Sequence, residues 1–106
     1  MRALTEIEQY VIEQVKKRRT SKGISQDKLS VMMGLNEKFV TKVENPNRIE
    51  KYNINHLNKI AEILECSVRD FFPEDPIPGE LQKSYWLFLH KGYLCKLIYR
   101  YLAIEQ

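Results

Sequence analysis

Two short helix-forming runs separated by a glycine constrain the fold more than any other feature of this chain. Residues 23–45 read GISQDKLSVMMGLNEKFVTKVEN. Gly34 stops the first run after about two helical turns, and Asn36 is placed to cap the second. Two such helices at a sharp angle bury little apolar surface by themselves. We therefore expect the rest of the chain to hold them in place so that one of them is presented to a ligand.

The sequence before this stretch predicts a long first helix at residues 5–21. Thr5 and Glu8 match the capping box, in which each side chain accepts a hydrogen bond from the other residue's backbone N–H. Gly23 is a natural stop beyond the end of the helix. Apolar residues follow the cap at four-residue spacing and form one stripe: Ile7, Val11 and Val15.

The sequence predicts four more helices, which gives an all-α domain of five. The second begins at the Ser25 cap, and the third runs from the Asn36 cap and ends before Pro46, with a turn at residues 45–48. A fourth starts near Asn53, and Ser67 caps a short fifth that ends at Pro73. The inward residues of the fourth helix have three- and four-residue spacing: Ile54, Leu57, Ile60, Ala61 and Leu64.

The remaining sequence divides into a linker and an aromatic extension. Residues 74–80 hold two prolines and a glycine between acidic residues, which is typical of a linker. Residues 81–106 are rich in Tyr, Trp, Phe and Leu and form the C-terminal extension. We expect two short helices that break near Gly92, while a β-hairpin that turns at residues 90–92 is a competing interpretation.

The charge distribution points to a polyanion. The chain carries a net charge of +3, yet residues 14–51 hold ten basic and four acidic side chains, so this segment is +6 and the rest is −3. A basic segment of this kind is typical of a surface that binds nucleic acid, although it also suits a merely solvated face.

Other function classes find no support in the sequence. Cys66 and Cys95 lie far apart without a CxxC motif, and neither His56 nor His90 has a neighbouring nucleophile or carboxylate constellation. We therefore expect no catalysis, no metal and no cofactor, and His56 to be a surface or helix-packing residue. No apolar run approaches the roughly 20 residues that span a bilayer, and no signal peptide is evident. Reduced thiols and these absences favour a cytoplasmic protein.

Helix, tight turn and second helix, set among further helices, is the helix-turn-helix arrangement. Residues 5–73 resemble the Cro and lambda-repressor-like (XRE) family of DNA-binding domains. The residues that carry the resemblance are Val15, Arg19, Gly23, Ile24, Ser25, Gln26, Leu29, Gly34, Leu35, Asn36, Val40, Val43, Glu44, Asn45, Leu57, Ile60, Ala61, Leu64, Ser67 and Phe72. The C-terminal extension has no counterpart in the family pattern. The resemblance thus implies a DNA-binding domain at residues 1–73.

The resemblance implies that the third helix enters the major groove of double-stranded DNA while the second crosses the backbone. Base-facing positions fall on Glu37, Lys38, Thr41 and Lys42. Lysine donates to guanine, glutamate accepts from cytosine, and the threonine methyl contacts thymine. The remaining positions implied to contact DNA, mainly its phosphates, are Gln26, Asn36, Asn45 and Arg48.

Two departures from the family pattern carry structural predictions. Glu65 stands where the family usually has the glycine that ends the fourth helix, which predicts a different exit from that helix. Val31 and Met32 are apolar where the family is normally polar, which would be explained if the C-terminal extension folds back over them.

The sequence therefore predicts a bacterial or phage-type transcriptional regulator, a dimeric repressor that blocks polymerase at its operator. The alternative is an antitoxin-like or adaptor protein whose aromatic extension binds a protein partner. The same extension serves homodimerisation equally well.

Overall fold

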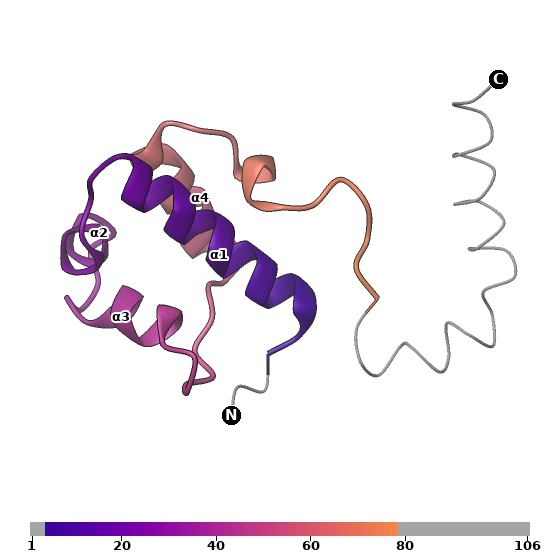
Figure 1. Ribbon diagram of the computed structural model, residues 1–106. Coiled ribbons are helices and arrows are strands. Elements are labelled where there is room, and N and C mark those ends of the chain that lie inside the picture. Colours follow the sequence, from indigo (N-terminus) through magenta and orange to yellow (C-terminus); the bar gives the residue numbers. More distant parts are fainter. Residues whose placement is uncertain (1–3, 79–106) are drawn as a thin grey trace, which may run out of the picture.

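A computed structural model describes residues 4–78, which fold into four α-helices and one turn of 3-10 helix (Figure 1). The elements are α1 (Glu6–Ser21), α2 (Gln26–Met32), α3 (Phe39–Glu44), α4 (Ile54–Leu64) and η1 (Val68–Phe71). The four longer predicted helices are confirmed, whereas the predicted fifth α-helix is a single 3-10 turn capped by Ser67. No strand occurs within residues 4–78. The predictions for the C-terminal extension lie outside the described residues.

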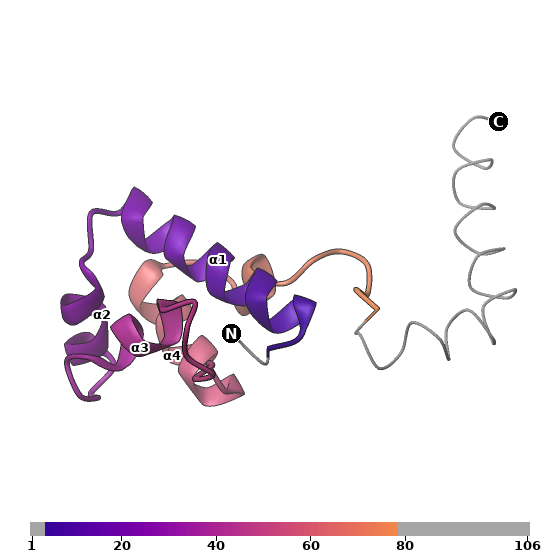
Figure 2. The same ribbon diagram turned by 60° about the horizontal axis from the view of Figure 1, so that its bottom comes forward.

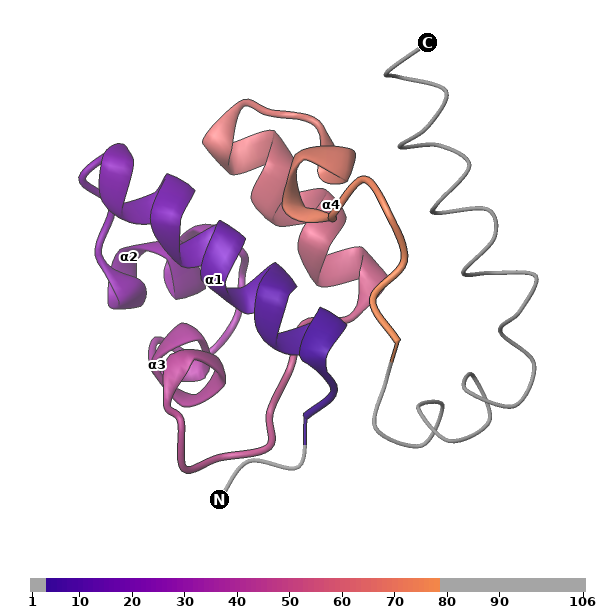
Figure 3. The same cartoon turned by 45° about the vertical axis from the view of Figure 1, so that its right-hand side comes forward.

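Helix α1 lies across the middle of the domain and holds the other elements together. It packs against α3, α4 and η1, while α2 packs against α3. Figure 3 shows α1 between the α2–α3 pair on one side and α4 on the other. In Figures 1 and 2 the α2–α3 pair lies at the end of the domain opposite to residues 73–78. The two short helices are thus presented at one end of the molecule.

Local capping signals set the helix ends largely where the sequence predicts them. Thr5 and Glu8 form the predicted capping box, and Ser25 accepts a hydrogen bond from the backbone N–H of Lys28. Gly23 and Gly34 end α1 and α2 with positive φ angles of 68° and 79°. A side chain is strained in this left-handed conformation, so glycine is the natural residue at both positions.

The exit from α4 contradicts the prediction of a different helix end. Glu65 adopts the left-handed conformation that glycine would take, with φ 55° and ψ 51°. The backbone N–H of Cys66 donates to the carbonyl oxygen of Ala61 at 3.0 Å, which is the hydrogen bond that closes a helix ended by glycine. The path of the chain is therefore the usual one, and Glu65 bears the steric cost of following it.

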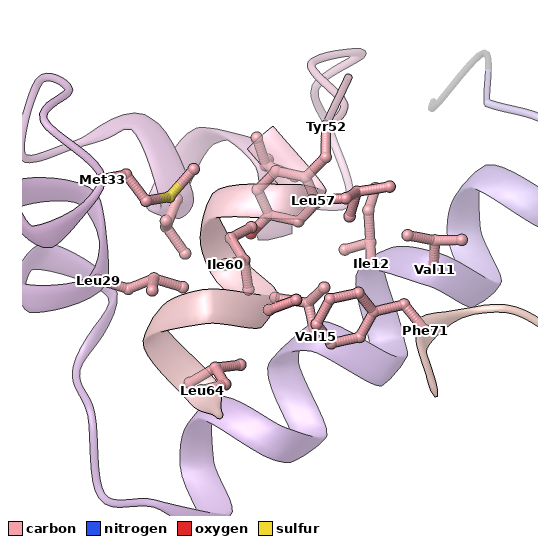
Figure 4. Close-up of a cluster of buried hydrophobic side chains, with 13 residues drawn as sticks. Val11, Ile12, Val15, Leu29, Met33, Tyr52, Leu57, Ile60, Leu64 and Phe71 are labelled. Atoms are coloured by element: carbon pink, nitrogen blue, oxygen red, sulfur yellow. The ribbon is translucent and has the colours of Figure 1, made fainter. Parts of the chain in front are cut away.

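The core forms where α1, α2, α3, α4 and η1 meet (Figure 4). Its buried apolar members are Val11, Ile12, Val15, Leu29, Met33, Val40, Val43, Tyr52, Leu57, Ile60, Ala61, Leu64 and Phe71. Ile54 was predicted to face inward, but its side chain is 80% exposed. Ile54 is the first residue of α4, and the described residues leave it largely exposed.

Some apolar side chains remain on the surface of the described domain. Val31 and Met32 on α2 are 61% and 43% exposed. Whether the C-terminal extension covers them, as the sequence predicts, lies outside the described residues. None of the helices within residues 4–78 combines the length and the apolar character needed to cross a membrane.

Candidate nucleic-acid interface

The turn between α2 and α3 determines where α3 begins. The side-chain oxygen of Asn36 accepts a hydrogen bond from the backbone N–H of Lys38 at 2.9 Å, and the N–H of Phe39 donates to the carbonyl oxygen of Asn36 at 2.9 Å. Asn36 was predicted to cap α3, but the N-cap position belongs to Lys38, whose side chain makes no capping bond. Asn36 here stabilises a tight turn at residues 37–38. The helix therefore begins only at Phe39. Glu37 therefore lies in the turn and not on α3.

Ser30 on α2 supplies the capping bond that α3 lacks. Its hydroxyl is fully buried, donates to the carbonyl oxygen of Gln26 and accepts from the backbone N–H of Val40, both at 2.9 Å. Val40 is the second residue of α3, so its N–H has no partner within its own helix. The start of α3 is thus fixed to α2 by a hydrogen bond. Sequence reasoning missed this role because a serine in mid-helix carries no local signal of a distant acceptor or donor.

A buried ion pair fixes the other end of α3. The guanidinium of Arg19 on α1 donates to the Glu44 carboxylate through Nε at 3.0 Å and through Nη2 at 2.8 Å. Its Nη1 donates to the carbonyl oxygen of Ile24 at 2.8 Å. The Arg19 and Glu44 side chains are only 8% and 1% exposed. Separating the two side chains would leave each of them as an uncompensated buried charge, which is costly. The pair therefore keeps the end of α3 against α1.

Gln26 and Thr41 extend this network to the surface. The Gln26 amide nitrogen donates to Glu44 at 2.9 Å, and its amide oxygen accepts from the Thr41 hydroxyl at 3.1 Å. Gln26 was predicted to contact a phosphate and Thr41 to contact a base. The structure brings them together and engages both polar groups inside the α2–α3 unit, where they fix the orientation of α3.

Lys38 and Lys42 present positive charge on this side of the domain. Lys42 lies exposed on the last turn of α3. Lys38 lies just before α3, and its Nζ contacts the two Asp27 oxygens at 3.0 and 3.3 Å. The hydrogen bond that the Lys38 ammonium donates to Asp27 raises the pKa of Lys38, so this ammonium stays charged. Asp27 on α2 was not among the predicted site residues.

The loop after α3 holds the last two predicted site residues. The predicted turn is present, since the backbone N–H of Arg48 donates to the carbonyl oxygen of Asn45 at 3.1 Å and the Asn45 side chain accepts from the N–H of Asn47 at 2.9 Å. Arg48 forms a two-pronged ion pair with Glu50, with N–O distances from 2.7 to 3.0 Å. This contact lowers the pKa of Glu50 and raises that of Arg48.

Aromatic packing supports α3 from the side of α4. The Phe39 ring lies 4.7 Å from the His56 ring and 6.0 Å from the Tyr52 ring, measured between centroids. His56 Nδ1 accepts a hydrogen bond from the backbone N–H of Asn53 at 3.0 Å, and burial lowers the pKa of the imidazole. His56 therefore packs against Phe39, as the sequence predicts for a helix-packing residue, and it also caps α4.

All eight predicted site residues lie on one continuous segment, from the start of α2 to the loop after α3. This segment forms the end of the domain where α2 and α3 lie side by side in Figures 1 and 2. In the part of the chain from residue 4 to residue 78, no three His, Cys, Asp or Glu side chains gather into a possible metal site.

Comparison with protein families identifies the α2–α3 unit. A model of the Cro/C1-type HTH DNA-binding domain matches residues 14–73, more than half of the chain. The chain belongs to this family. A Cro/C1-type domain is a helix-turn-helix DNA-binding module of transcription regulators, and the match contains every predicted site residue.

Solved structures show the same fold. The restriction-modification controller protein C.AhdI from Aeromonas hydrophila is 28% identical, with a TM-score of 0.51 over 59% of this chain and 92% of that one. A chain of the SinR/SinI protein complex is 21% identical, with a TM-score of 0.52 over 91% of this chain and 99% of that one, and this likeness concerns the fold alone. A search of curated proteins finds no match.

Proposed function

We propose that this Cro/C1-type protein is a sequence-specific transcriptional repressor that binds an operator as a dimer in the cytoplasm. The observation that carries the proposal is the way α3 is held. Ser30 fixes its start, the Arg19–Glu44 pair fixes its end, and Lys42 projects from its exposed surface. A short helix fixed so firmly, with Lys42 on its outer side and Lys38 just before its first residue, suits insertion into a major groove.

The contacts divide between base reading and positioning. Lys42 on α3 and Glu37 and Lys38 in the preceding turn are the proposed base-reading residues, with Thr41 beside them. Asn36, Asn45 and Arg48 are the proposed backbone contacts, which fix register without reading sequence. Gln26 contributes by orienting Thr41, and by a phosphate contact only if DNA displaces its amide from Glu44.

Two ion pairs compete with DNA at this surface. Asp27 holds Lys38, and Glu50 holds Arg48. Both pairs are solvent-exposed, and such pairs contribute little to stability, so phosphates can replace the carboxylates at small cost. C.AhdI, the 28% identical protein, is named as a controller protein of restriction and modification, and this supports a role in regulation.

Selection of bound duplexes from a random DNA pool, at near-physiological salt, tests the proposal. An enriched inverted repeat with half-sites about one helical turn apart would support a dimeric, sequence-specific regulator. In vitro transcription from a promoter that carries the repeat should then fall as protein is added. A complete lack of enrichment, or a full-length chain that stays monomeric at micromolar concentration, would contradict the proposal.

Alanine variants separate base reading from positioning. Lys42→Ala should weaken operator binding by about 1–3 kcal/mol and relax the preference at one base pair if Lys42 reads a base. Arg48→Ala should weaken binding to all sequences alike. It should also make the plot of log affinity against log salt concentration less steep, by about 0.9, which corresponds to one phosphate contact. Lys59→Ala is the matched control, because Lys59 is an exposed lysine on α4 that pairs with Glu62. Equal losses in all three variants would refute the assignment.

The alternative function is protein binding through the C-terminal extension, as in an antitoxin-like protein or an adaptor. It is supported by the density of aromatic residues between positions 81 and 106. Truncation after Asp75 should abolish partner binding under this alternative, while Lys38→Ala and Lys42→Ala should leave it intact. For the repressor, the supporting result is the reverse: Lys38→Ala and Lys42→Ala lose affinity for DNA, while the truncated protein keeps it.

A further inference from the structure

An apolar groove lies on the domain away from the α2–α3 unit. It is formed by the first half of α1, the residues that lead into α4 and the segment after η1, and it encloses about 570 Å³. Its apolar walls include Ile7, Val11, Tyr52, Ile54, Leu57 and Phe72. Figure 4 shows Val11, Leu57 and Tyr52 of this set within the core, so the floor of the groove is the outer surface of the core itself.

Two of the apolar side chains that line the groove are exposed to solvent. Ile54 is 80% exposed and Phe72 is 39% exposed. The polar rim, in contrast, is already satisfied on one side, since Lys51 pairs with Glu8 and this hydrogen bond lowers the pKa of the Glu8 carboxyl. An apolar hollow with a paired polar rim fits an apolar side chain and not a charged ligand.

We propose that residues 85–88 of the same chain, Tyr-Trp-Leu-Phe, dock in this groove. The position at which the described chain ends carries the argument. Phe72 forms a wall of the groove, and the chain continues from it through residues 73–84 to the aromatic segment. Twelve intervening residues reach roughly 40 Å when extended, so the segment can return to the groove that it starts from. A tether of this length gives an effective concentration on the order of millimolar, so even a weak contact forms within one chain.

Docking would give the extension a fixed position relative to α3. The residues of the loop after α3, from Lys51 to Asn53, also line the groove. A segment seated there contacts the connection that leads from the recognition helix into α4. The docking itself does not rest on DNA binding.

Trp86 makes the proposal directly measurable, because it is the only tryptophan in the chain. We would record its emission and its quenching by acrylamide in the full-length protein. A docked Trp86 emits at shorter wavelength than a solvated indole and is poorly quenched. Ile54→Asp should shift the emission to longer wavelength and raise the quenching constant severalfold. Because Ile54 is exposed at the first position of α4, where an acidic residue is favourable, the variant keeps its fold.

Ile49→Asp is the matched control. Ile49 is 63% exposed and does not line the groove, so this variant should leave Trp86 unchanged. Phe72→Ala is the second test variant and should reproduce the effect of Ile54→Asp. Equal spectra in Ile54→Asp and Ile49→Asp, or a fully solvated Trp86 in the unmodified protein, would overturn the proposal. An emission shift that appears only as protein concentration rises would also overturn it, because it would assign the groove to a second copy.

Discussion

Replacing Glu65 by glycine should raise the free energy of unfolding of the domain by about 0.5–1 kcal/mol. Glu65 ends α4 with φ 55°, where a Cβ atom crowds the following carbonyl and costs about 1–2 kcal/mol. Glycine removes that cost but loses more conformational entropy on folding, which destabilises the domain by roughly 0.5–1 kcal/mol. The side chain of Glu65 is exposed, so no core contact is lost. For a domain of this size the gain corresponds to a rise of about 2–8 °C in Tm.

Urea denaturation followed by circular dichroism measures the effect, and Glu65→Ala is its control. A carboxylate at the C-terminal end of a helix is mildly unfavourable, so part of any gain could arise from removing charge. Alanine removes the same charge but keeps the Cβ atom, and it should therefore gain at most a few tenths of a kcal/mol. If alanine stabilised the domain as much as glycine, the explanation through backbone conformation would be refuted. DNA affinity should be the same in both variants, because Glu65 lies outside the α2–α3 unit.

Three further predictions concern the support of α3. Ser30→Ala should destabilise the domain by about 1–3 kcal/mol, because it leaves the buried N–H of Val40 without its acceptor. A loss below about 0.5 kcal/mol in urea denaturation would contradict this role of Ser30. Glu44→Gln should cost about 3–5 kcal/mol, because the buried charge of Arg19 loses its counter-charge; thermal unfolding near that of the unmodified protein would contradict this. The folded state depresses the pKa of His56, so its contribution to stability is complete above the unfolded value of about 6.5 and declines as the pH falls through the folded value. His56→Gln should therefore flatten the stability–pH curve below neutral pH, and an unchanged slope in urea titrations would exclude His56 as its cause.

Local signals made much of the fold predictable from the sequence. A capping box such as Thr5 and Glu8 and a stop such as Gly23 act within a few residues, so the sequence pattern contains both partners. Asn36 shows the limit of this approach, because its side chain can cap a helix or close a turn, and the structure uses it for the turn. Ile54 fits the helical spacing of the core but lies at the end of α4, where spacing alone cannot show that the packing has ended.

The sequence predicted where the candidate site lies, but not the hydrogen bonds that join its side chains to one another. The family pattern places Gln26 and Thr41 near DNA, but it does not reveal that Glu44 and Arg19, which are 25 positions apart, bind Gln26 into a network. The exit at Glu65 was mispredicted for a related reason. A missing glycine suggested another path, whereas tertiary packing imposed the usual path on a glutamate.

The brevity of α3 has a consequence for how the protein loses function. A helix of six residues has no stability in isolation, so α3 exists only while Ser30, Arg19 and the core hold it. Its amide hydrogens should exchange with solvent only when the whole domain opens, and at the same rate as those of the core. A partly unfolded copy would then have no recognition helix to offer. Occupancy of an operator would follow the folded fraction of the domain and decline together with it.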